Sequence, residues 1–172
     1  MFAGKHYGRI MQQLTIQTTE YKTCAITGHR VLEKNFSRER LTEALRALIL
    51  QGVEEFYNGL ALGFDLITAE VLVELRKEYP HIKLHGCIPF YGQENRFPAE
   101  EKARYVKLVK ECDDTVILSE KYTQGCYFNR NDYMVEHADV LFAYCHSDKG
   151  GAAYTVRVFI RKKGFENIVF FE

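Results

Sequence analysis

The stretch DVLFAYC at residues 139–145 carries no charged side chain after its first residue. A strand that is covered on both faces reads as a continuous apolar run, whereas a strand with one wet face alternates between apolar and polar residues. The runs VIL at 116–118 and IVFF at 168–171 have the same character. Together they predict a parallel sheet with helices on both of its faces.

Segments with helical spacing separate these runs along the chain. The clearest one places Leu41, Leu45 and Leu48 on one face, with Ser37 as its predicted N-cap. Six strands are predicted, at residues 23–27, 54–58, 83–88, 114–119, 139–145 and 167–171. Further helices are predicted at residues 65–78, 99–111, 131–137 and 153–163. This alternation predicts an α/β fold, a Rossmann-like three-layer sandwich with a mainly parallel sheet of about five or six strands flanked by helices.

The length of 172 residues fits a single folded domain, which we expect over residues 22–172. Residues 1–21 show no clear periodicity and are interpreted as an N-terminal extension outside the core. Lys and Arg together number 23, as do Asp and Glu, so the overall charge does not favour binding to nucleic acid.

The five cysteines are an odd number and include no Cys-x-x-Cys pair, which argues against a disulfide framework. Neither a secretory signal nor an apolar run of about 18 residues occurs, so no membrane association is expected. His81 and His85 are four residues apart, but the interval between them runs into a predicted strand rather than a helix, and no metal site is predicted from them. These features indicate a cytoplasmic protein with reduced thiols.

Ligands of open parallel sheets bind beyond the carboxyl ends of the strands, where helix N-termini present free N–H groups. The strand-to-helix turns therefore contain the candidate ligand-binding residues. These are Gly28, His29, Arg30, Gly59, Gly63, Asp65, Pro89, Arg130, Asn131, Gly150, Gly151 and Thr155.

The pair Gly150-Gly151 is the best candidate for a phosphate cradle, because missing Cβ atoms let backbone N–H groups approach an anion. A flexible surface turn is the alternative, and the two hypotheses are about equally favoured. Thr155 either adds a hydroxyl to the site or simply lies in the first turn of the predicted helix.

Each charged candidate also has a second interpretation. Arg30 offers a fork of donors to a phosphate or is a solvated surface charge. Asp65 accepts ribose hydroxyls or caps the helix that it opens. Arg130 and Asn131 are ligand partners or the polar start of a short helix. Neither Gly-x-Gly-x-x-Gly after the first strand nor a P-loop occurs, so a dinucleotide oxidoreductase or a P-loop NTPase is not expected.

Six sequence blocks, in order, resemble the SLOG superfamily, a Rossmann-like group that includes the cytokinin-activating phosphoribohydrolases and the DNA-processing protein DprA. The chain is most similar to its YpsA-like branch of small bacterial and phage proteins. The blocks are Thr27-Gly28-His29-Arg30, Gly59 with Ala61-Leu62-Gly63 and Asp65, Ile88-Pro89-Phe90 with Gln93 and Arg96, Tyr122-Thr123 with Gly125-Cys126, Arg130-Asn131 with Tyr133-Met134-Val135, and Gly150-Gly151 with Thr155-Val156.

The resemblance implies a pocket for nucleotide-derived ligands at the strand ends. The chain departs from the family pattern at Ala152, where a threonine is usual, so one hydroxyl near the expected phosphate is missing. The phosphoribohydrolases also have an acidic residue soon after this loop, where this chain has Tyr154 and its neighbours. This departure argues against the same hydrolysis.

Three functions follow as hypotheses. The first is binding or sensing of a small phosphate-bearing nucleotide or nucleotide-sugar, with no other cofactor required. The second is hydrolysis of an N-glycosidic or phosphate bond, which needs a carboxylate such as Asp65 or Glu70. The third is a protein-interaction adaptor, with a homo-oligomer as one form, favoured only by the aromatic content of 13% and the polar aromatic loop at residues 122–128.

Overall fold

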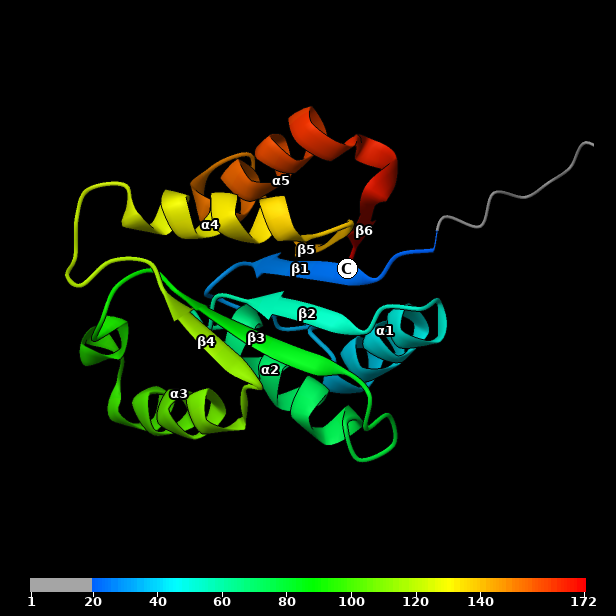
Figure 1. The fold of residues 1–172 in the computed structure, drawn as a ribbon, viewed down its shortest axis with the longest axis horizontal. Helices are drawn as coiled ribbons and strands as arrows, with labels where there is room; N and C mark the ends of the chain where they lie inside the picture. Colours follow the sequence, from blue (N-terminus) through cyan, green and yellow to red (C-terminus); the bar gives the residue numbers. More distant parts are fainter. Residues whose placement is uncertain (1–19) are drawn as a thin grey trace, which may run out of the picture.

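A computed structural model describes residues 20–172 and contains one six-stranded sheet with helices on both faces (Figure 1). The strands are β1 Thr23–Gly28, β2 Glu55–Asn58, β3 Lys83–Ile88, β4 Asp114–Ile117, β5 Val140–Tyr144 and β6 Ile168–Phe170. The helices are α1 Arg38–Leu50, α2 Phe64–Leu75, α3 Ala99–Glu111, α4 Cys126–His137 and α5 Gly150–Lys163, with short 3-10 helices at Gln93–Arg96 and Phe165–Asn167.

All five strand pairs are parallel, and the strand order is β4-β3-β2-β1-β5-β6. The chain therefore builds outward from β1 to β4 and then returns to the other side of β1. This reversal between β1 and β5 is the topological switch point, where open α/β sheets form a crevice at their carboxyl edge.

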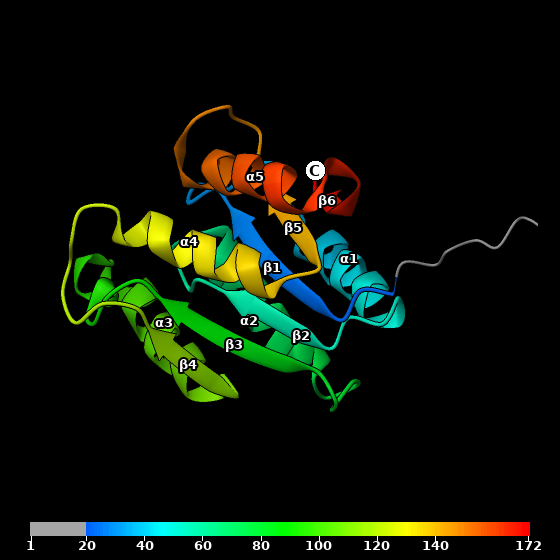
Figure 2. The same cartoon turned by 45° about the horizontal axis from the view of Figure 1, so that its top comes forward.

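Helices α1, α2 and α3 cover one face of the sheet, while α4 and α5 cover the other (Figure 1). Leu141 and Phe142 of β5 are both fully buried, one against each layer of helices. Helix α4 lies over β1, β2 and β3, and edge strand β4 is largely exposed (Figure 2). The predicted three-layer α/β sandwich is confirmed.

All six predicted strands are present, within two residues of their predicted ends. Ser37 caps α1 as predicted, because its hydroxyl accepts a hydrogen bond from the Arg40 N–H at 3.2 Å. All five cysteines are free. The predicted extension at residues 1–21 lies outside the described residues except for its last two, and the Tyr21 hydroxyl donates to Asn167.

Three helix starts differ from the prediction. Helix α4 begins at Cys126 rather than at residue 131, so Arg130 and Asn131 lie inside it rather than before it. Helix α5 begins at Gly150, which places the glycine pair in its first turn rather than in the preceding loop. Asp65 is the second residue of α2 and does not cap it, since the N-cap is Gly63.

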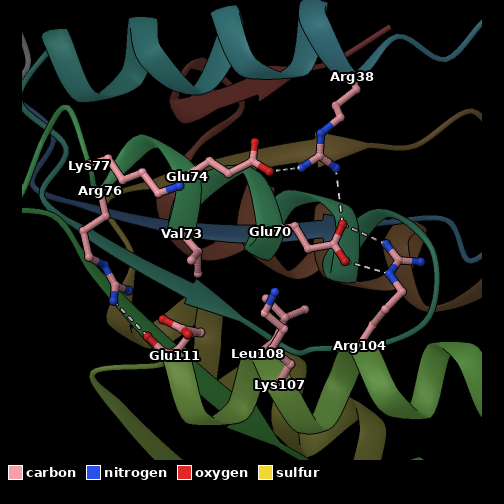
Figure 3. Close-up of a pocket in the computed structure, with 10 residues that line it drawn as sticks. All are labelled: Arg38, Glu70, Val73, Glu74, Arg76, Lys77, Arg104, Lys107, Leu108 and Glu111. Carbon is pink, nitrogen blue, oxygen red and sulfur yellow. Dashed lines mark hydrogen bonds and ion pairs between the residues drawn. The ribbon is translucent and has the colours of Figure 1, made fainter.

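Glu70 of α2 joins three helices through ion pairs (Figure 3). Arg104 of α3 donates to both of its carboxylate oxygens, at 2.7 and 3.0 Å, and Arg38 of α1 donates at 3.3 Å. Partial burial alone would raise the pKa of Glu70, but the two arginines more than offset this effect, so the pKa is lowered. Glu70 therefore stabilises the packing of α1, α2 and α3.

Replacing Glu70 by glutamine should lower the free energy of unfolding by about 1 to 2 kcal/mol at pH 7, the range for a partly exposed bidentate pair within a network. A lowered pKa contributes stability above the ordinary value of 4.5, and this contribution is lost as the pH falls through the folded-state pKa. Urea unfolding should therefore show a smaller difference from wild type at pH 3 than at pH 7.

Glu74→Gln is the matched control, because Glu74 is more exposed and pairs with Arg38 alone. This substitution should lower the free energy of unfolding by less than about 0.5 kcal/mol. Equal losses of unfolding free energy for the two variants, or a Glu70→Gln loss that is as large at pH 3 as at pH 7, would contradict the network.

Candidate functional site

A cavity of about 330 Å³ opens at the carboxyl edge of the sheet, beside the switch point between β1 and β5. It brings together eight of the twelve candidate ligand-binding residues. These are Gly28, His29, Arg30, Asp65, Arg130, Asn131, Gly150 and Gly151. They come from the end of β1 and the residues that follow it, from the first turns of α2 and α5, and from the second turn of α4.

The Arg130 side chain, which is only 6% exposed, spans the inner end of this cavity. Its Nη1 donates to the Gly59 carbonyl at 2.8 Å and its Nε donates to Asn131 Oδ1 at 2.7 Å. Its Nη2 makes no hydrogen bond within residues 20–172. A buried guanidinium needs partners for its donors, so this nitrogen is available to an anionic ligand.

Asn131 continues the hydrogen-bond chain to the N-terminus of α5. Its amide Nδ2 lies 3.5 Å from the Gly151 carbonyl, to which the Thr155 hydroxyl also donates at 2.9 Å. Thr155 is 1% exposed and does not line the cavity. It therefore orders the first turn of α5 from behind.

Gly59 is required for the close approach of Arg130 to β2. A Cβ at this position would lie 2.1 Å from Arg130 Nη1 and 2.9 Å from Asp65 Oδ2. The next residue, Leu60, is buried with a left-handed φ of 50°, and its N–H donates to Asn58 Oδ1 at 2.7 Å. The Asn58 side chain thus compensates a strained turn that presents the Gly59 carbonyl to Arg130.

The N-terminus of α5 forms one wall of the cavity through Gly150, Gly151 and Ala152. Gly150 has a φ of 89°, which an L-residue adopts only with strain. Among residues 20–172, no side chain caps this helix end. Its first N–H groups and the positive end of its dipole therefore face the cavity without a side-chain partner.

Asp65 places a buried carboxylate in the same cavity. Burial raises its pKa to about 6, although the nearby charge of Arg130, the Ala61 N–H and Arg30 all act to lower it. The Ala61 N–H lies 3.4 Å from Asp65 Oδ2. Near neutral pH this carboxylate is ionised and can accept hydrogen bonds from ligand hydroxyls.

His29 faces the cavity in a defined tautomer. Its Nε2 accepts the His146 N–H at 2.8 Å, so the proton of the neutral ring lies on Nδ1. Burial and the nearby His146 lower the pKa of His29, which favours this neutral form. The Nδ1–H group is a donor that the ring can offer to a ligand.

Four candidate ligand-binding residues lie outside the cavity lining: Gly59, Gly63, Pro89 and Thr155. Gly59 and Thr155 hold residues that do line it. Glu70, named as a candidate catalytic carboxylate, lies in a separate groove between α2 and α3 and is paired with Arg38 and Arg104 (Figure 3). Of the two carboxylates named for catalysis, only Asp65 faces the cavity.

Six lining residues are not among the twelve candidate ligand-binding residues: Ile26, Thr27, Ala61, Tyr127, Met134 and Ala152. Most are small or apolar and resemble core residues, so nothing in their type marks a site. Within residues 20–172, no group of three His, Cys, Asp or Glu side chains is placed to hold a metal ion. No helix in this range is both long and apolar enough to cross a membrane.

Asp65 should leave a pH signature on stability. Its pKa is about 6 in the folded protein against an ordinary 3.8, so between these values the folded state holds a proton that the unfolded chain has lost. The free energy of unfolding should therefore fall as the pH rises through this window, by up to about 3 kcal/mol, relative to Asp65→Asn.

Urea unfolding of wild type and Asp65→Asn at pH 4, 5, 6 and 7 measures this difference directly, because the other titrating groups are common to both proteins. A difference that does not change with pH would show that Asp65 is not a buried, desolvated carboxylate.

Comparison with known proteins places the chain in a family. The YpsA family, described as the YspA SLOG family, matches residues 24–168. A UPF0398 protein of Staphylococcus haemolyticus is 30% identical over 152 residues, covering 81% of each protein. A UPF0398 protein of Bacillus pumilus is 30% identical over 149 residues, covering 79% of this chain and 80% of the relative.

Among solved structures, DNA processing protein A from Helicobacter pylori, which is described with a single-stranded DNA binding mode, matches with a TM-score of 0.61. The identity is 17%, and the match covers 91% of this chain and 67% of that one. DNA processing protein A from Streptococcus pneumoniae matches with a TM-score of 0.57 at 15% identity. This match covers 84% of this chain and 48% of that one. At these identities the likeness concerns the fold. The family match and the 30% identical relatives show that the chain belongs to the YspA SLOG family.

Proposed function

We propose that the protein binds a small, phosphate-bearing, nucleotide-derived ligand in the cavity at the carboxyl edge of the sheet. The observation that carries this proposal is the convergence of Arg130, Arg30 and the uncapped N-terminus of α5 on one cavity. Its volume of about 330 Å³ lies at the lower end of the range for small-ligand pockets.

The phosphate fits the inner wall, between the first turn of α5 and the free Nη2 of Arg130. Backbone N–H groups at a helix N-terminus and a guanidinium are both strong phosphate donors. Arg30 is exposed and has no ion-pair partner within residues 20–172, so it can turn toward the same phosphate without breaking an ion pair.

The Asp65 carboxylate supports a sugar attached to this phosphate, because two vicinal hydroxyls are the donors that such an acceptor selects. The neutral His29 adds one further donor. The ligand thus meets cationic groups at the phosphate and an anionic group at the sugar.

A larger cavity, of about 700 Å³, lies between α2 and α3 but is a weaker candidate. Its arginines are already paired, Arg38 and Arg104 with Glu70, and Arg76 with Asp113. An anion there would have to compete with these carboxylates.

Hydrolysis of the bound nucleotide is the second candidate, favoured by the raised pKa of Asp65, which suits a general base near neutral pH. Chromatography of nucleotides incubated with the protein distinguishes the two functions. Binding alone leaves the nucleotide intact, whereas hydrolysis releases free base or phosphate and should be lost in Asp65→Asn while that variant remains folded.

A thermal-shift screen tests the binding proposal, because a ligand that binds only the folded state raises the melting temperature. Adenosine 5′-monophosphate, ADP and ADP-ribose are suitable probes, with calorimetry to measure their affinities. Arg30→Ala should weaken binding of the positive probe by about 1.5 to 3 kcal/mol, the usual contribution of a hydrogen bond to a charged group.

Arg40→Ala is the matched control, because Arg40 is an exposed arginine of α1 outside the cavity lining. It should leave the affinity unchanged. If no probe binds, the proposed function is wrong; if Arg40→Ala and Arg30→Ala weaken binding equally, the cavity is not the site.

A further inference from the structure

We infer that the mouth of this cavity is a stacking subsite for a nucleobase, formed by Tyr127 and Arg30 and extended by Tyr122 and Arg96. The inference rests on the proposed function and adds to it the part of the ligand that is planar and aromatic. It also explains an aromatic cluster that phosphate binding does not require.

Tyr127 connects the ligand cavity with the aromatic cluster. It lines the cavity, and the Arg30 guanidinium carbon lies 5.7 Å from the centre of its ring. A base attached through its sugar to a phosphate at α5 would leave the cavity between these two side chains. Tyrosine rings and guanidinium planes are the usual stacking partners of nucleobases in proteins.

Phe90 packs against both tyrosines of the subsite. It is 6% exposed and lies edge-on to Tyr122 and Tyr127, with ring centres 5.5 and 5.8 Å away. The two tyrosines are 6.3 Å apart and tilted by 59°. Within residues 20–172, neither tyrosine has a parallel aromatic partner, so both are available for stacking.

Tyr122 and Arg96 form a second pair of the same kind as Tyr127 and Arg30. The Arg96 guanidinium carbon lies 5.3 Å from the ring centre of Tyr122, and Tyr122 is 50% exposed. Neither Arg30 nor Arg96 forms an ion pair within residues 20–172. Tyr122 is exposed and Tyr127 half-buried, and each lies beside an arginine that forms no ion pair in this range, which suits a ligand with a planar ring and negative charge.

Phe128 provides a contrast on the same helix. Its ring centre lies 4.4 Å from that of Tyr154, and it does not line the cavity. Aromatic residues at the start of α4 therefore divide into one that packs on α5 and one that faces the ligand cavity.

Adenosine 5′-monophosphate and ribose 5-phosphate form a matched pair of probes, since they differ only in the base. Tyr127→Leu should weaken the monophosphate by about 5- to 150-fold, the range for loss of one stacked base, and ribose 5-phosphate by less than about twofold. Tyr127→Phe keeps the ring and should restore the affinity. Calorimetry measures all of these affinities, and melting temperatures confirm that the variants fold.

The chain contains no tryptophan, so Tyr127→Trp introduces a single fluorescent reporter. Its emission should be quenched in a saturable manner by adenosine 5′-monophosphate and not by ribose 5-phosphate. Phe128→Trp is the matched control and should respond to neither probe.

The outcomes separate the subsite from the phosphate site. Equal affinities for the two probes, with no selective effect of Tyr127→Leu, would overturn the subsite while leaving the proposed function intact. If neither probe binds, both the stacking subsite and the proposed function are wrong. A third probe, a ten-nucleotide oligodeoxyadenylate, distinguishes two sources of the base. Tighter binding of this oligonucleotide than of the monophosphate, with steep salt dependence, would show that the base belongs to a single strand. Tighter binding of the monophosphate would identify a free nucleotide.

Discussion

The buried hydrogen bonds of Arg130 are the constraint on which the rest of the site depends. Through Gly59 they reach β2, and through Asn131 and Gly151 they reach the start of α5. An arginine this deeply buried is costly unless its donors are satisfied, and burial lowers its pKa against the opposing charge of Asp65. The side chain therefore holds both sides of the switch point in position and leaves one nitrogen for a ligand.

The parallel sheet explains why these groups meet. The strand order brings β1 between β2 and β5, so the turns after all three strands open onto the same edge. The uncapped helix α5, the two arginines and Asp65 then share one cavity. The groove between α2 and α3 is larger, but its three arginines are held in ion pairs that stabilise helix packing.

The strands could be predicted because the central ones are covered on both faces and show continuous apolar runs, as at Val140–Tyr144. The start of α4 could not, because two of its inward positions are Arg130 and Asn131, which a hydrophobic pattern reads as a surface. The polar residues that hide the helix from sequence analysis are those that build the site.

Prediction of the site residues from the sequence has a similar limit. Turn position indicated several of the segments that line the cavity, although the turn at Pro89 is not one of them. It could not distinguish residues that face the cavity from those that support them, such as Gly59 and Thr155. Asp65 and Glu70 are five residues apart on α2, and this spacing directs them toward different neighbours. Tyr127 belongs to the aromatic stretch noted from the sequence, but sequence alone could not distinguish its cavity-facing ring from that of Phe128, which packs on Tyr154.

Amide chemical shifts in a ¹⁵N-labelled sample titrated with adenosine 5′-monophosphate test the location of the site most directly. The largest shifts should occur at the backbone amides of Gly150, Gly151 and Ala152 and at the Arg130 side chain. Shifts concentrated at Arg104 and Lys107, in the groove between α2 and α3, would contradict the account.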